Sequence, residues 1–560
     1  MLTETEKRYN NVLAIIDKRL IPNEEAKKAR GEVFTPLKLV REMLFGLRKN
    51  AIQEGRIEIW GIDAAGKYID DDEENRVGGI PLEVWRNPNT TWLDPANGIG
   101  NFPVVAFYML DYQLGKHGPP EFRGDDKKHK RRKHIVEKML YMIEINKGNV
   151  NASRKIFGQM VPSAEANICC ADSLTMTDEK LAAAYKGVNR FDVVIGNPPF
   201  NEGGTKHHSD RGFYTKFITY GFNILTQEGY LVFVHPPNYH RIDKDDPKKG
   251  IVVKKIFNDN NLIFMRIISD TKDYFDVQIA IDYYVLQKRN NAGNAIILDK
   301  RNILTEGIDI SLFESIPNFG FAIIKKLLKL KKKHGGFTAK IGRDSAKHTS
   351  RNELFKEGTY PIIHLINEDG VRILLATTEH PYQTTPKVII NGLGVPYVLD
   401  DTGGKYGVSE APNYILNPSE KECIFLFSKL FQYLNWAYRI QGNKNDRYLF
   451  DSMPDLNKFD FKDEKTMITQ LGLSIEDEKE INKYDVPTFP LIEKIEVAGE
   501  SKEAKQKRRN TAKAAKKAAI AASKAENKLA RTTTKRSTTS QKGGYRSKYG
   551  RTRKANKQHT

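Results

Sequence analysis

The most chemically distinctive segment of the chain is Asn197-Pro198-Pro199-Phe200, which follows an apolar run at 191–196 that we expect to be a buried strand. Two consecutive prolines supply no N–H donors, fix the backbone and leave their carbonyl oxygens as acceptors. Such a rigid loop offers an amide oxygen, a backbone carbonyl and an aromatic face, which suits a planar, amine-bearing base. The alternative is a plain strand ended by proline, and the four-residue pattern argues against it.

A second segment places an acid and two glycines between an expected strand and an expected helix. Residues 93–102 read Leu-Asp-Pro-Ala-Asn-Gly-Ile-Gly-Asn-Phe. Gly98 and Gly100 would let the backbone approach a ligand closely, and the helix start supplies free N–H groups. Alone, this turn is weak support for a ligand site, because a tight connection between elements has the same pattern.

Two further acids follow the next expected strands. Glu144 ends a run at 139–144, where nucleotide-binding α/β sheets place an acid that accepts hydrogen bonds from ribose hydroxyls. That acid stands about 20 residues after the glycines in such sheets, whereas Glu144 stands 44 residues after Gly100, so an insertion must be assumed. Asp172 follows the run at 166–170 and could accept from an exocyclic amine; a helix N-cap role remains equally open.

The elements that would position these residues alternate between strand and helix. This alternation predicts an α/β fold with a mostly parallel sheet and helices on both faces. The polar stretch 111–134 is expected to be a loop. The expected strands lie at 91–94, 139–144, 166–170, 191–196, 229–234, 262–268 and 277–286.

In their order, these motifs resemble the S-adenosylmethionine-dependent N6-adenine DNA methyltransferases of restriction-modification systems, in the class whose cofactor motifs precede the Asn-Pro-Pro-Phe motif. Residues 31–36, Gly-Glu-Val-Phe-Thr-Pro, resemble the leading cofactor motif of that class. The resemblance covers about residues 28–290 and implies a Rossmann-like class I methyltransferase sheet.

The resemblance also implies a role for each motif residue, with S-adenosyl-L-methionine as the cofactor. Glu144 would hold its ribose, and Asp172 with Ile145 its adenine ring. The residues around its methionine part would be Phe34, Thr35, Pro36, Asp94, Ala96, Gly98 and Gly100.

The same resemblance assigns catalysis to Asn197, Pro198, Pro199 and Phe200. Asn197 and the Pro198 carbonyl would hydrogen-bond the target amine of an adenine flipped out of duplex DNA. Phe200 would stack on that base, and Phe275 would pack on its other side.

Two other kinds of function remain open. Asn-Pro-Pro-Tyr/Phe motifs also occur in methyltransferases that act on RNA or on protein glutamine, although the leading motif and the large C-terminal half favour DNA. A non-catalytic DNA-binding protein on a methyltransferase scaffold is a different class. The intact motifs argue against it, because a dead site need not keep them.

The chain is expected to divide into three parts. Residues 1–300 would be the methyltransferase catalytic domain, and 301–495 an α+β domain that recognises the DNA target. Within 301–495, the stretches 387–392, 401–404 and 453–456 resemble parts of such recognition regions. An accessory α+β domain without base contacts is the alternative. Residues 496–560 would be a disordered tail rich in Lys, Arg and Ala.

The net charge of +20 belongs almost entirely to that tail. Residues 501–560 hold 20 Lys and Arg against two Asp and Glu, whereas residues 1–500 hold 70 against 68. The tail is therefore expected to bind nucleic acid without sequence preference and with steep salt dependence, unless it only aids solubility.

Composition also argues against several classes of protein. No apolar run is long enough to span a membrane, and the N-terminus lacks an apolar signal-peptide region. The three cysteines make neither a disulfide framework nor a C-x-x-C zinc pair. We therefore expect a soluble intracellular protein with no metal and no obligate protein partner.

Overall fold

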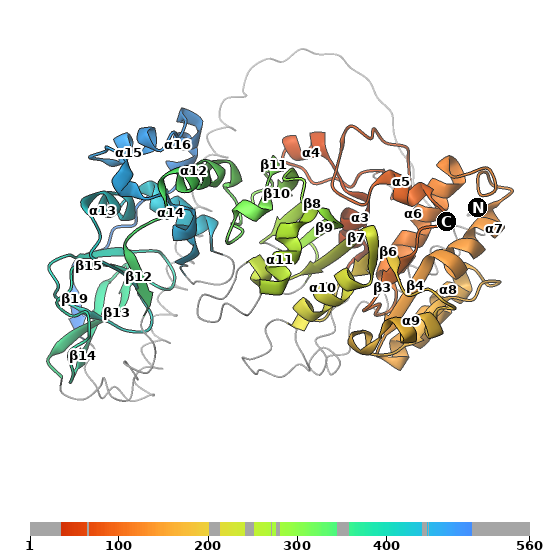
Figure 1. Ribbon diagram of the computed structural model, residues 1–560, viewed down its shortest axis with the longest axis horizontal. Helices are drawn as coiled ribbons and strands as arrows, with labels where there is room; N and C mark the ends of the chain where they lie inside the picture. Colours follow the sequence, from red (N-terminus) through yellow and green to blue (C-terminus); the bar gives the residue numbers. More distant parts are fainter. Residues whose placement is uncertain are drawn as a thin grey trace, which may run out of the picture.

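The computed structural model of the chain describes residues 35–63, 66–200, 213–240, 251–269, 271–275, 280–343, 358–439, 445 and 447–495. A nine-stranded mixed sheet forms its first lobe, called the sheet lobe here (Figure 1). The strand order is β11-β10-β8-β9-β7-β6-β3-β4-β5. The strands are β3 (Trp92–Asp94), β4 (Leu140–Glu144), β5 (Asn167–Cys170), β6 (Phe191–Gly196), β7 (Leu225–His235), β8 (Asn260–Ile268), β9 (Ile281–Asn290), β10 (Ala295–Leu298) and β11 (Leu304–Ile308).

The expected α/β sheet is confirmed, and it is mixed. Strands β3 to β7 run parallel, whereas β9 lies antiparallel between β7 and β8. All seven expected strands are present as β3 to β9, with bounds shifted by a few residues. β10 and β11 extend the same sheet past residue 300, at the edge beyond β8.

Helices cover both faces of this sheet, because the central strands are apolar on both sides. In β6, Val193 and Ile195 pack into one core and Val194 into the other, which is the two-residue period of a strand. The first face is covered by α3 (Leu37–Phe45), α5 (Leu82–Arg86), α6 (Asn101–His117) and α8 (Lys147–Met160). The second face is covered by α9 (Asp178–Ala184), α10 (Phe213–Asn223) and α11 (Ile251–Asp259).

The expected loop at 111–134 was wrong over much of its length. α6 runs on to His117, and α7 (Lys128–His134) is a second helix, followed by a five-residue π-helix (Ile135–Met139). The polar composition misled the prediction, since Arg131 and Arg132 pair with Asp111 of α6 and so fasten α7 to the fold. A small antiparallel pair, β1 (Leu47–Arg48) with β2 (Arg76–Val77), and the short α4 (Lys49–Gln53) precede α5.

The described residues from 313 to 495 form a second lobe, called the C-terminal lobe here, which contains two four-stranded sheets. Their inner faces share a core in which Ile363 and Ile373 belong to one sheet and Ile389 and Leu399 to the other. The first sheet consists of β12 (Lys340–Arg343), β18 (Asn413–Leu416), β15 (Lys387–Ile390) and β16 (Val398–Asp401). The second consists of β17 (Gly407–Val408), β13 (Tyr360–Asn367), β14 (Gly370–Ala376) and β19 (Glu493–Ile495).

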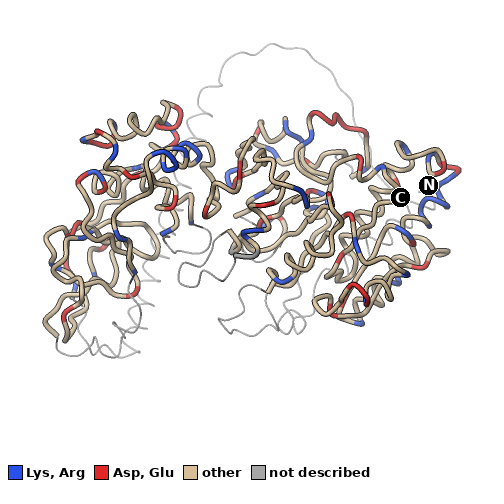
Figure 2. Tube along the Cα trace, in the orientation of Figure 1, with Lys and Arg blue, Asp and Glu red and all other residues tan. Residues whose placement is uncertain are grey.

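Helices connect the two lobes through one continuous apolar core. Phe313, Phe319 and Tyr433 belong to the same buried cluster as the second face of the nine-stranded sheet. The helices of this lobe are α12 (Phe321–His334), α13 (Glu420–Leu426), α14 (Lys429–Ala437), α15 (Glu464–Gln470) and α16 (Ile475–Ile481). Figure 2 shows Lys and Arg gathered on α12 and, at the opposite end of the molecule, on α7.

Three sequence-based expectations concern residues outside the described part: Phe34, the start of the chain and the tail at 496–560. Among the described residues, no helix is long and apolar enough to cross a membrane.

Candidate active site

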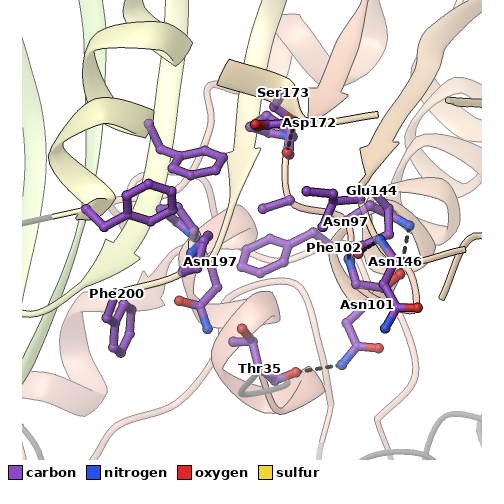
Figure 3. A pocket seen from close by; sticks show the side chains of 18 of the residues that line it. Thr35, Asn97, Asn101, Phe102, Glu144, Asn146, Asp172, Ser173, Asn197 and Phe200 are labelled. Atoms are coloured by element: carbon purple, nitrogen blue, oxygen red, sulfur yellow. Dashed lines mark hydrogen bonds between the residues drawn. The ribbon is translucent and has the colours of Figure 1, made fainter. Parts of the chain in front are cut away.

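A pocket of about 350 Å³ lies at the carboxyl ends of β3 to β6 (Figure 3). Parallel strands bring their carboxyl ends to one edge, so motifs far apart in the sequence meet there. The pocket is lined by Thr35, Pro95, Ala96, Asn97, Gly98, Asn101, Phe102, Glu144, Ile145, Asn146, Ala171, Asp172, Ser173, Asn197, Pro198, Pro199, Phe200, Phe213 and Phe217.

The glycine loop after β3 is fastened to the end of β4 by Glu144. One carboxylate oxygen of Glu144 accepts the Gly98 N–H at 2.7 Å, and the other accepts the Asn146 N–H at 2.7 Å. The Asn97 N–H also donates to the Ile143 carbonyl at 3.0 Å. These bonds fix the Glu144 carboxylate at the pocket wall.

Gly100 shapes the loop without lining the pocket. Its φ is +99°, and an added Cβ would lie 2.8 Å from the Ser153 hydroxyl, which accepts from the Asn97 amide at 2.8 Å. The first residue of α6, Asn101, donates its side-chain N–H to the Thr35 carbonyl at 2.8 Å. This bond ties the leading motif to the glycine loop, while Pro36 stands just before α3 and outside the lining.

Asp94, the acid at the end of β3, lies directly behind the pocket. Its side chain is buried, and one oxygen accepts the Ala96 N–H at 3.0 Å. The other oxygen is buried and has no hydrogen-bond partner in the described part of the chain. Burial raises the pKa of Asp94 to about 8, and the negative charge of Glu144 adds to this rise.

Gly196, which ends β6, is a functional position that the sequence reasoning missed. Its φ is +155°, and an added Cβ would lie 2.9 Å from the Asp94 carboxylate. Only glycine therefore leaves room for Asp94 while delivering Asn197 to the pocket. The available signal was a glycine that stands directly before the asparagine motif.

Asp172 and Ile145, which the resemblance assigns to the adenine ring of the cofactor, both line the pocket. Asp172 accepts the Leu174 N–H at 3.0 Å and so caps a short 3₁₀ helix (Ser173–Thr175), and it also lines the pocket. Asp172 is therefore an N-cap and a lining residue at once, so the two interpretations do not exclude each other. Ile145 is 67% exposed, an unusual state for an isoleucine, and provides an apolar face at the pocket.

The Asn-Pro-Pro-Phe loop forms the opposite wall. Figure 3 shows Asn197 and Phe200 on one side of the pocket and Glu144 and Asn146 on the other. Phe213 and Phe217 of α10 line the same pocket, with ring centroids 5.6 Å apart and planes at 74°. These two rings were missed, and their only signal was a four-residue spacing on the helix that follows the motif.

Phe275, the other predicted base-packing residue, does not line this pocket. Its ring is half-buried against the core of the first face, and its N–H donates to the Thr271 carbonyl at 2.7 Å. Its predicted role remains untested. Within the described ranges, no group of three His, Cys, Asp or Glu side chains is placed to hold a metal ion.

Part of the chain is similar in sequence to known methylases. Residues 84–275, which include β3 to β8, match the family model of the Eco57I restriction-modification methylase. A protein of Mycoplasma pneumoniae described as an adenine-specific methylase is 26% identical over 316 residues, covering 42% of this chain and 70% of that protein.

Two solved structures are also similar to the chain. The M protein of the type I restriction enzyme EcoKI matches with a TM-score of 0.30 and 14% identity, over 52% of this chain and 66% of its own. The nuclease-deletion mutant of the type ISP enzyme LlaGI matches with a TM-score of 0.40 and 14% identity, over 81% of this chain and 47% of its own. The chain thus spans about half the length of LlaGI. The match of residues 84–275 to the model of a restriction-modification methylase family confirms the resemblance predicted from the motifs.

Proposed function

We propose that the chain is a site-specific DNA methyltransferase that transfers a methyl group from S-adenosylmethionine to N6 of an adenine. The observation that carries this proposal is that one pocket joins the glycine loop and Glu144 to the Asn197–Phe200 loop. The residues proposed to bind the cofactor and those proposed to bind the amine therefore line the same pocket. The family of residues 84–275 and the adenine-specific relative support the same chemistry.

The residues around the glycine loop fit the cofactor. Glu144 is fixed by two backbone N–H groups, so its carboxylate is held in one orientation at the pocket, where ribose hydroxyls would donate to it. Ile145 and Asp172 offer an apolar face and a carboxylate for an adenine ring. The unpartnered oxygen of Asp94 suits the cationic methionine part. When bound, the cofactor supplies a methyl group on a positively charged sulfur.

The loop after β6 fits the target amine. The lone pair of adenine N6 is delocalised into the ring, which makes N6 a weak nucleophile. The amide oxygen of Asn197 and the carbonyl of Pro198 would accept the two N6–H bonds and favour a tetrahedral nitrogen whose lone pair points across the pocket. Positioning and fixed dipoles then supply most of the catalysis.

A base inside a duplex cannot reach this pocket, so the adenine must flip out of the stack. Flipping costs a few kcal/mol, and stacking on Phe200 offsets part of that cost. Phe213 and Phe217 add two more rings to the lining of the pocket. This cluster of aromatic side chains is a natural receptor for an extruded base.

The C-terminal lobe would read the DNA sequence, with its two small sheets and α12 facing a duplex. The tail at 496–560 would then hold the enzyme on DNA without adding specificity. Deleting 501–560 should weaken non-specific binding and flatten the dependence of affinity on salt, because fewer phosphates are neutralised. Binding titrations between low and high salt measure this, and an unchanged slope would contradict the tail's proposed role.

The test of the main proposal is transfer of tritiated methyl groups from S-adenosylmethionine to duplex DNA, RNA and protein, assayed in parallel. Label in DNA adenine supports it; label only in RNA or glutamine identifies one of the alternative substrates. No label on any substrate would favour the non-catalytic alternative.

Two substitutions distinguish the proposed amine-binding side of the pocket from the proposed cofactor-binding side, by turnover and by cofactor affinity. Asn197→Ala should lower turnover by at least about 100-fold with nearly unchanged cofactor affinity, since it removes a group that contacts only the target amine. Asp94→Ala should instead lose cofactor binding in calorimetry. Retained turnover by Asn197→Ala would overturn the proposed mechanism.

A further inference from the structure

We propose that the sheet lobe carries a second ligand site, for a nucleoside phosphate, on the outer side of α6. A cavity of about 670 Å³ lies there between α6, α7 and the segment at 66–68. Three tyrosines and five cationic side chains surround it. Its lining consists of Gly66, Lys67, Tyr68, Tyr108, Asp111, Tyr112, Gly115, Lys116, Gly124, Asp125, Lys128, Arg131 and Arg132.

This cavity is separate from the methyltransferase pocket. Asn101 at the start of α6 lines the first pocket, and Lys116 near its end lines the second. Fifteen residues at 1.5 Å per residue put about 22 Å between those two positions. A nucleotide in the second cavity would therefore not overlap the cofactor or the target base.

The cavity has a surplus of positive charge. Five cationic side chains and two carboxylates, Asp111 and Asp125, line it, and Lys116 is paired with Asp70 beside the cavity. Asp111 accepts hydrogen bonds from Arg131 Nε and Arg132 Nε, both at 2.7 Å. Arg131 is only 4% exposed, and its Nη1 donates to the carbonyls of Phe122 and Gly124. Two guanidinium groups sharing one carboxylate favour an anion, and phosphate oxygens match guanidinium geometry best.

Aromatic rings form a second part of the cavity wall. Tyr68 and Tyr112 are stacked, with ring centroids 5.7 Å apart and planes at 27°. The Tyr112 hydroxyl donates to the Asp70 carboxylate at 2.8 Å, which holds that ring in place. Rings of this kind stack on nucleobases without regard to sequence. Cations beside stacked tyrosines thus fit a ligand that has both a phosphate and a base.

Gly115 leaves the space that the buried guanidinium of Arg131 occupies. An added Cβ at this position would lie 2.9 Å from the terminal atoms of Arg131. Glycine within a helix costs about 1 kcal/mol relative to alanine. A Gly115→Ala change should therefore favour the helix while displacing the Arg131 guanidinium from the cavity.

The test is calorimetric titration of the full chain, with S-adenosylhomocysteine in excess so that the first pocket is filled. The probes are thymidine triphosphate, inorganic tripolyphosphate and a single-stranded oligothymidylate. We expect saturable binding of the triphosphate, weaker binding of tripolyphosphate, and at least a tenfold loss with Gly115→Ala. Stronger binding of the oligonucleotide would identify the ligand as a nucleotide unit of a nucleic acid strand.

Matched variants control for the fold. Gly158→Ala adds a methyl group on α8 with nothing within 4 Å and should leave binding unchanged. Lys128→Gln should weaken binding, whereas Lys133→Gln on the same helix, outside the cavity lining, should not. Methyl transfer should continue in all four variants. Absence of saturable binding by thymidine triphosphate and oligothymidylate, or equal losses in cavity and control variants, would overturn the proposal.

Discussion

Two buried carboxylates, one in each lobe, have opposite surroundings. Asp401 in the C-terminal lobe accepts from the N–H groups of Lys405 at 2.7 Å and Tyr406 at 3.1 Å, and it forms a buried ion pair with Lys387 at 2.7 Å. Asp94 in the sheet lobe accepts one N–H and keeps a buried oxygen without a partner. Both side chains are almost fully buried.

This difference separates a scaffold group from a ligand-binding group. The hydrogen bonds of Asp401 are completed inside the fold, so its charge is compensated whether or not a ligand is bound. Asp94 is buried without such compensation, which costs stability until a cation or donor arrives. Removing the partner of Asp401 should therefore lower the free energy of unfolding, whereas neutralising Asp94 should raise it.

The largest effect is expected at the compensated site. Lys387→Met would leave Asp401 buried without its counter-charge and should lower the free energy of unfolding by about 3–5 kcal/mol. Thermal unfolding by calorimetry measures this loss. Cofactor affinity of the folded variant should stay unchanged, and the exposed Lys332→Met provides a matched control with little effect. A stable Lys387→Met protein would show that the pair is dispensable.

At Asp94 the carboxylate itself should lower the free energy of unfolding, and the size of this effect should depend on pH. The pKa of Asp94 is about 8 in the folded chain and about 3.9 in an unfolded one. The folded state therefore holds an extra proton between these values, and its stability falls as pH rises from about 4 to 8.

Asp94→Asn removes this penalty. Near pH 4 the variant and the wild type should be similarly stable, and at pH 8 the variant should be more stable by about 2–4 kcal/mol. Urea unfolding at several pH values, followed by tryptophan fluorescence, measures the difference, since Trp92 lies two residues from Asp94 in β3. A wild-type stability that does not fall between pH 5 and 8 would contradict the raised pKa.

The arrangement of the pocket was predictable because its motif residues directly follow the central strands. Each central strand is apolar on both faces and so reads as a hydrophobic run, and the residue after the run lies at the carboxyl edge of the sheet. This reasoning brought Glu144, Asp172 and Asn197 to one edge, where the structure places them.

Other features could not be predicted from the sequence, because they depend on contacts with residues that are distant in the chain. The helix at 128–134 looked like a solvated loop, since nothing in its own composition shows that Arg131 and Arg132 pair with Asp111. In the C-terminal lobe, β12 pairs with β18 some 70 residues later, and no local pattern encodes that pairing. Phe213 and Phe217 reach the pocket only through the packing of α10.

The smallest expected effect concerns the space beside Asp94. Gly196→Ala would place a methyl group 2.9 Å from its carboxylate, at a φ of +155° that side chains rarely adopt. We expect a loss of about 1–2 kcal/mol in stability and a lower turnover, because Asn197 follows directly and must shift. Gly158→Ala, which has open space and helical backbone, controls for the added methyl group. Turnover and the free energy of unfolding should both fall in Gly196→Ala and stay unchanged in Gly158→Ala. Unchanged turnover in Gly196→Ala would show that Asn197 is positioned by the prolines after it rather than by the glycine before it.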